Sequence, residues 1–186
     1  MAKLLSKLVN SVKEGVTSAL KGAADVGSAG VKAIKDVTVD ALKGAEKTVT
    51  AGVDGAASVV KGALDGIADL GKTTIEALKG TVNGAVQGFK SAGGKQEHAV
   101  KGAVGQAVRS AKDLGLDLGK AAVAAVQGAL EGVKQVGGDA AKATKDAVLA
   151  AYDAAKDIGG GAAEAVRSSL EEGIDGAKDI LKSIKE

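Results

Sequence analysis

An 11-residue period runs through the whole chain without an insertion or a deletion, and it limits the fold more than any other feature. When the sequence is cut into elevens from Met1, the eleventh position is Ala, Gly or Ser in every complete unit. The first position is apolar in almost every unit, with Thr144 as the exception. Because eleven residues make three turns of an α-helix at about 3.67 residues per turn, the period predicts helix.

The period gathers apolar side chains on one side of each expected helix. Positions 1, 4, 5, 8 and 9 of the unit cover one arc, and lysines at position 2 lie at its edge. Aspartates at position 3, among them Asp146 and Asp157, are expected near the middle of the polar face, in water. The apolar arc is the candidate interaction face, and its residues are Val12, Val16, Leu20, Val31, Ile34, Leu42, Val53, Val60, Leu64, Ile67, Ile75, Leu78, Val82, Val86, Phe89, Val100, Val104, Val108, Val126, Leu130, Val133, Val148, Tyr152, Val166, Leu170 and Ile174.

A longer period is superimposed on the first. An Asp-apolar-Gly motif starts at residues 25, 69, 113 and 157, and from Gly71 onward position 5 alternates between glycine and valine, which gives a 22-residue unit. We predict a single all-α array over residues 1–186, made of long, near-continuous amphipathic helices. Bends or helix ends, at which the chain could fold back, are expected near residues 27–30, 71, 93–94, 115–119, 137–138 and 159–161.

Composition makes these helices conditional on a partner surface. The chain has 28 Gly and no Pro, and each interior glycine costs a helix about 1 kcal/mol relative to alanine. Such a helix is marginal alone in water, so its apolar arc must meet a lipid surface, its own folded-back length or another copy. Gly80, Gly84 and Gly88 form a run of small residues that favours close packing of two helices.

Charge and motifs argue against most site chemistry. Lys and Arg number 25 against 23 Asp and Glu, so the basic stripe of a nucleic-acid-binding protein is missing. With no Cys and one His, we expect no catalytic residues, no metal site, no cofactor and no small-molecule substrate. One segment matches the phosphate-binding P-loop pattern, but the repeat already accounts for its glycines, so we interpret the match as chance: Gly66, Gly71, Lys72 and Thr73.

The N-terminal apolar run is broken by Lys7, which argues against a signal peptide. The longest uncharged apolar run lies between Lys120 and Glu131, well short of the roughly 20 residues that a spanning helix needs. A cytoplasmic location, or a peripheral one at a membrane or lipid surface, is therefore expected.

The 11/22-residue pattern resembles the class of amphipathic repeat proteins that contains exchangeable apolipoproteins, synucleins, perilipin-type lipid-droplet coats and group 3 late-embryogenesis proteins. The segment Lys13-Glu14-Gly15-Val16 is similar to the synuclein repeat core. Proline, which punctuates apolipoprotein repeats, is replaced here by glycine, and the mean hydropathy of +0.10 is higher than in late-embryogenesis repeats. The resemblance implies amphipathic helices that act at an interface.

Three functions are compatible with these features, and none is enzymatic. In the first, the protein coats a lipid or other hydrophobic surface through its shallow Val/Ala/Leu face. In the second, it is a structural bundle or filament that assembles with copies of itself through Ala/Gly-rich faces. In the third, it is a desiccation protectant of the late-embryogenesis type.

Overall fold

The computed structural model describes residues 2–23, 28–43 and 52–184, and every regular element in these ranges is a helix, which confirms the all-α prediction. Residue 27, where one expected bend begins, lies outside them. The helices are α1 (Ala2–Leu20), α2 (Ser28–Lys43), α4 (Val53–Asp69), α5 (Ile75–Ser91), α6 (Gln96–Asp113), α7 (Leu118–Gln135), α8 (Ala140–Ile158), α9 (Ala162–Gly173) and α10 (Ala177–Lys182).

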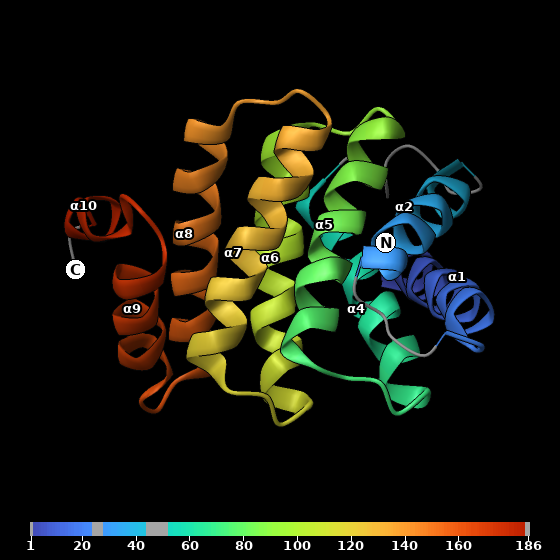
Figure 1. Ribbon diagram of the computed structural model, residues 1–186, viewed down its shortest axis with the longest axis horizontal. Helices are drawn as coiled ribbons and strands as arrows, with labels where there is room; N and C mark the ends of the chain where they lie inside the picture. The colour runs from blue at the N-terminus through green and yellow to red at the C-terminus, as the bar shows by residue number, and fades with distance from the viewer. Residues whose placement is uncertain (1, 24–27, 44–51, 185–186) are drawn as a thin grey trace.

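The helices stack into two layers along the longest axis of the molecule. They succeed one another from α1 and α2 at one end to α9 and α10 at the other (Figure 1). The most extensive contacts join α1 to α4, α4 to α6 and α6 to α8 in one layer, and α2 to α5, α5 to α7 and α7 to α9 in the other. Helices that are neighbours in sequence pack across the layers through smaller contacts. The fold is therefore a continuous stack of helix pairs, and two 22-residue units make one pair.

Glycines with positive φ end four successive helices in the same way. Gly71, Gly93, Gly115 and Gly137 have φ between +70° and +97° and follow α4, α5, α6 and α7. At Gly115 the N–H donates to the carbonyl of Lys112, and the N–H of Leu116 donates to the carbonyl of Ala111. This pair of bonds is the Schellman motif, in which a left-handed residue closes the helix, and it recurs at the other three glycines.

The next helix begins three or four residues after each of these glycines. Thr74, Asp117 and Asp139 precede α5, α7 and α8, and their side chains accept hydrogen bonds from the backbone N–H groups of Ala77, Lys120 and Lys142. Such N-caps satisfy amide groups that have no partner within the helix. Helix stop and helix start thus share one short segment, so the 22-residue period continues through the turn.

The structure corrects the prediction of long, near-continuous helices. The longest described helices, α1 and α8, have 19 residues each, and the chain reverses direction after each of the helices α4 to α8 (Figure 1). Two 11-residue units fit one helix together with its turn, so an uninterrupted sequence period does not require an uninterrupted helix. The physical reason is the glycine that follows each helix, because its positive φ is incompatible with continuation of a right-handed α-helix.

Replacing Gly115 with alanine is expected to lower the free energy of unfolding by about 1 kcal/mol, because a Cβ atom is strained at φ +74°. Gly22 is the matched control, since a Cβ atom there would have no neighbour within 4 Å and its φ lies outside the left-handed region. Urea denaturation of both variants measures the difference. An equal effect of the two substitutions would contradict the helix-ending role of Gly115.

Glycines also bring helices of one layer close together. A Cβ atom on Gly84 of α5 would lie 2.7 Å from the carbonyl oxygen of Val31 in α2, and one on Gly88 would lie 2.9 Å from that of Lys35. Gly62 and Gly66 of α4 face the backbone of α1, and Gly128 and Gly132 of α7 face that of α5. Glycines four residues apart therefore form one face of a helix on which the neighbouring backbone rests.

Candidate functional site

The apolar arc is mostly buried inside the molecule. Most of its residues are buried between the two layers, including Val12, Ile34, Leu64, Val104 and Val166. The exceptions are Val31, Ile75 and Leu130, which are half-buried, and Val53, which is 38% exposed. Of the predicted close-packing glycines, Gly84 and Gly88 lie against α2, and Gly80 is buried in α5.

The P-loop-like segment has a different structure from a phosphate-binding loop. Gly66 belongs to helix α4, which takes the place of the strand that such a loop requires. Gly71 ends that helix, and Thr73 lies in the connection to α5. The ammonium group of Lys72 donates one hydrogen bond of 3.1 Å to the carbonyl oxygen of Leu20 and a second to the carbonyl oxygen of Ala23. This lysine ties the end of α1 to the α4–α5 turn.

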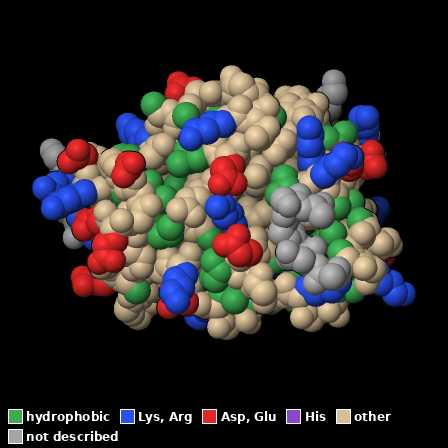
Figure 2. All heavy atoms as spheres, viewed as in Figure 1, with side chains coloured by type: hydrophobic (Ala, Val, Ile, Leu, Met, Phe, Trp, Pro, Cys, Tyr) green, Lys and Arg blue, Asp and Glu red, His purple; other side chains and the backbone are tan. Residues whose placement is uncertain are grey.

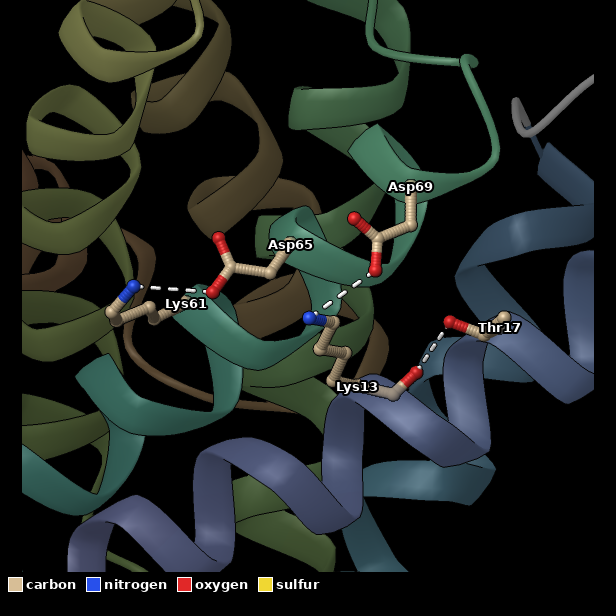
Figure 3. Close-up of polar contacts among 5 residues, drawn as sticks. All are labelled: Lys13, Thr17, Lys61, Asp65 and Asp69. Atoms are coloured by element: carbon tan, nitrogen blue, oxygen red, sulfur yellow. Dashed lines mark hydrogen bonds and ion pairs between the residues drawn. The ribbon is translucent and has the colours of Figure 1, made fainter.

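On the face shown in Figure 2, charged side chains of both signs are interspersed and hydrophobic side chains form small separate patches. Several ion pairs connect helices of the same layer. Lys13 of α1 lies 3.2 Å from Asp69 of α4, beside the Lys61–Asp65 pair within α4 (Figure 3). Further pairs of this kind join Lys79 to Glu131 and Arg109 to Asp157. Exposed pairs of this type contribute little to stability.

Lateral grooves lie on both layers of the described structure, and two of them are large. The first, the α5–α7–α9 groove, has a volume of about 510 Å³ and is lined by residues that include Ile75, Lys120, Val123 and Glu172. The second, the α6–α8 groove, has a volume of about 540 Å³ and is also bordered by the first turn of α4. It is lined by Val53, Asp54, Ala57, Lys101, Gly102, Gly105, Arg109, Lys145, Asp146, Leu149, Ala150 and Asp153.

The α6–α8 groove contains a buried carboxylate without a full set of partners. Asp146 is 7% exposed, and its Oδ2 atom has no hydrogen-bond partner. Two of the nearby lysines pair with Glu97, which lies 2.7 Å from Lys101 and 3.6 Å from Lys142. The hydrogen bond from Lys101 lowers the pKa of Glu97, whereas burial raises the pKa of Asp146 above its ordinary value, against the attraction of Lys101.

The burial of Asp146 corrects the expectation that it faces water. The 22-residue period aligns Asp146 with the small, buried residues Ser58, Gly80, Gly102 and Ala124, and also with the exposed residues Glu14, Asp36 and Ser168. That position packs against the neighbouring helix of the same layer, as Gly102 does against α4. Neither the 11-residue nor the 22-residue register reveals this burial, because the same position is exposed in α1, α2 and α9 and buried in α4 to α8.

Replacing Asp146 with alanine is expected to raise the free energy of unfolding at pH 7 by about 1 kcal/mol, because a buried carboxylate oxygen without a hydrogen-bond partner is costly. A raised pKa in the folded state means that the fold is favoured by protonation. The penalty is therefore absent below the ordinary value of 3.8 and develops as the pH rises through the raised value. Urea denaturation at pH 4 and pH 7 measures the change.

Asp65→Ala is the control for that substitution, because Asp65 also lies within a helix but pairs with Lys61 at the surface. Its effect is expected to stay within about 0.5 kcal/mol at both pH values. The assignment is wrong if Asp146→Ala destabilises the protein at pH 7 or if its effect does not change with pH. The charged groups of Glu97, Lys101, Lys142 and Lys145 act on the Asp146 carboxyl group, and neither variant replaces any of them.

Comparisons with known proteins identify no relative of this chain. No family model, no curated protein and no solved structure matches it. Over the described ranges, the helices are too short or too polar to cross a membrane. Within the same residues, no three His, Cys, Asp or Glu side chains are grouped as metal ligands would be.

Proposed function

We propose that this chain is a non-enzymatic structural protein whose helices form a self-contained stack. The observation that carries the proposal is the burial of the apolar arc between two layers of a single chain. Residues such as Val12, Val60 and Leu78 have no exposed surface left for another partner. The requirement that the arc meet a surface is satisfied by the folded-back chain itself.

The Ala/Gly-rich faces support the same proposal. The contacts that were expected between copies of the chain are made between helices of one layer, as at Gly84 against α2 and Gly128 against α5. Among the described residues, Val53 is the one large hydrophobic side chain that is exposed. The face shown in Figure 2 carries charged side chains of both signs, and such a surface disfavours association between copies of the chain.

A lipid coat remains the second candidate function, and the composition of the core favours it. The buried side chains are mostly alanine and valine, and these bury less apolar area per residue than leucine or phenylalanine. Separation of the two layers therefore costs less than in a leucine-rich core. In this proposal, the layers part at a lipid surface and the arc residues lie in the interface.

Light scattering combined with size-exclusion chromatography, together with flotation on phosphatidylcholine vesicles, distinguishes these functions. For the self-contained stack we expect a mass near 18.1 kDa at every protein concentration and no protein in the lipid fraction. A mass that grows with concentration would favour assembly between copies. Recovery of the protein with the vesicles would favour the coat and overturn the proposal.

A further inference from the structure

Two nearly identical segments of the chain have different structures. Residues 52–56 read Gly-Val-Asp-Gly-Ala, and residues 173–177 read Gly-Ile-Asp-Gly-Ala. In the first segment, Asp54 and Gly55 belong to the first turn of α4, and the N–H of Gly55 donates to the carbonyl oxygen of Gly52 at 3.1 Å. The helix therefore fixes this Asp-Gly pair and uses its amide group.

The second segment connects α9 to α10 at one end of the stack (Figure 1). Asp175 and Gly176 are both exposed, and they belong to neither helix. Gly176 has a φ of +83°, and within the described ranges no carbonyl accepts a hydrogen bond from its N–H. Its amide nitrogen is therefore accessible, and the lack of a side chain on glycine lets the Asp175 carboxyl group approach that nitrogen.

An aspartate that precedes glycine can react with the backbone when the chain leaves the two groups free to meet. The amide nitrogen of the glycine attacks Cγ of the neutral carboxyl group, the N–Cγ bond forms, and the hydroxyl group leaves as water with the amide proton. The product is a five-membered succinimide ring. Water then opens the ring at either carbonyl, which gives aspartate or isoaspartate. In isoaspartate the main chain runs through Cβ and Cγ.

We propose that Asp175 is the site at which the folded chain isomerises spontaneously to isoaspartate. A pair inside a helix reacts only after the helix opens locally, whereas a pair in an exposed turn reacts without that step. The inference rests on the chemistry of this turn and does not depend on the proposed structural function. The three other Asp-Gly or Asn-Gly pairs of the chain lie within helices: Asp54–Gly55, Asp65–Gly66 and Asn83–Gly84.

Isomerisation releases α10 from the stack. The turn is closed by a 3.2 Å hydrogen bond from the N–H of Ala177 to the carbonyl oxygen of Ile174. These two residues are buried, as is Leu181 of α10. Isoaspartate at position 175 adds a carbon atom to the main chain inside the closed turn. The residues on its two sides then cannot both keep their buried positions.

Peptide mapping of folded protein after incubation at 37 °C and pH 5 tests the proposal, because mild acid supplies the neutral carboxyl group that the attack requires. Trypsin yields residues 168–178, which contain Asp175, and residues 48–61, which contain Asp54. Chromatography with electron-transfer fragmentation separates and identifies the isoaspartate form of each peptide. We expect isoaspartate to form at least about tenfold faster at Asp175 than at Asp54. Equal rates, or no isoaspartate at Asp175, would overturn the proposal.

The same incubation in urea tests whether the fold causes the selectivity. Since the two segments have nearly the same sequence, the rates at Asp54 and Asp175 are expected to become similar once the protein is unfolded. A preference for Asp175 that persists in urea would assign the selectivity to the local sequence and contradict the proposal.

Variants separate the modification from its structural effect. Asp175→Glu keeps the charge but requires a six-membered ring, which closes far more slowly, so it is expected to abolish the product. Asp54→Glu is the matched control and is expected to leave the product at Asp175 unchanged. Far-UV circular dichroism checks that both variants are folded. A wild-type yield of isomerised peptide 168–178 in Asp175→Glu would contradict the assignment.

Hydrogen exchange of the α10 amides measures the release. We expect residues 177–182 to lose protection in the isomerised chain and to keep it in Asp175→Glu protein incubated in the same way. Unchanged protection of these amides in chains that carry isoaspartate would contradict the release of α10.

Discussion

Replacing Gly84 with valine is expected to lower the free energy of unfolding by about 3 kcal/mol, since the new side chain overpacks a full contact. Its Cβ atom alone would lie 2.7 Å from the carbonyl oxygen of Val31 and 2.9 Å from the Cβ atom of Ile34. The carbonyl belongs to the backbone of α2, so it cannot move without the helix. The layer that joins α2 to α5 would have to separate. Urea denaturation measures the loss.

Gly105→Val is the matched control for Gly84→Val, because both glycines lie inside helices of the stack. A Cβ atom on Gly105 would meet only Arg109 Nη1 at 3.3 Å and the carbonyl of Ala150 at 4.0 Å. The arginine can move, and valine is a better helix former than glycine by a few tenths of a kcal/mol. We therefore expect a change of less than about 1 kcal/mol. Equal losses in the two variants would show that close backbone approach does not organise the layer.

Replacing Phe89 with alanine is expected to lower the free energy of unfolding by about 3–5 kcal/mol, because it removes a large buried side chain and leaves a cavity. Phe89 is the single phenylalanine of the chain and is 1% exposed. Its ring covers Gly94 in the turn after α5, where a Cβ atom would overlap it. The substitution should therefore also loosen the connection between α5 and α6.

Thermal unfolding measures this loss as a fall in Tm of about 10 °C for a chain of this length. Phe89→Leu keeps most of the apolar volume and is expected to cost less than about 1.5 kcal/mol. If alanine were tolerated as well as leucine, the ring would contribute no packing that a smaller side chain lacks. The account of the core around the α5–α6 turn would then be wrong.

The sequence was sufficient to predict the all-α fold and the inward side of each helix. Apolar residues at helical spacing leave one consistent arc, and side chains such as Val12, Leu64 and Val166 are buried as members of that arc. Burial of an arc follows from the hydrophobic effect whatever covers it. For this reason the pattern alone could not distinguish lipid, a second copy or the same chain as the covering surface.

The helix turns and the groove were harder to predict. A glycine at the fifth position can sit inside a helix or end it, and only the conformation at Gly71 or Gly115 decides. Asp146 was assigned to the polar face because the 11-residue register averages a buried position with an exposed one. Its burial depends on how closely α8 packs on α6, which is a tertiary contact that no local pattern records.

The central claim is that the chain satisfies its own apolar arcs, and far-UV circular dichroism tests it most directly. Spectra are recorded across protein concentration, with and without phosphatidylcholine vesicles. We expect strong helicity in dilute buffer that changes neither with protein concentration nor with lipid. A coil spectrum in buffer that becomes helical only with vesicles would contradict the claim and establish the lipid coat in its place.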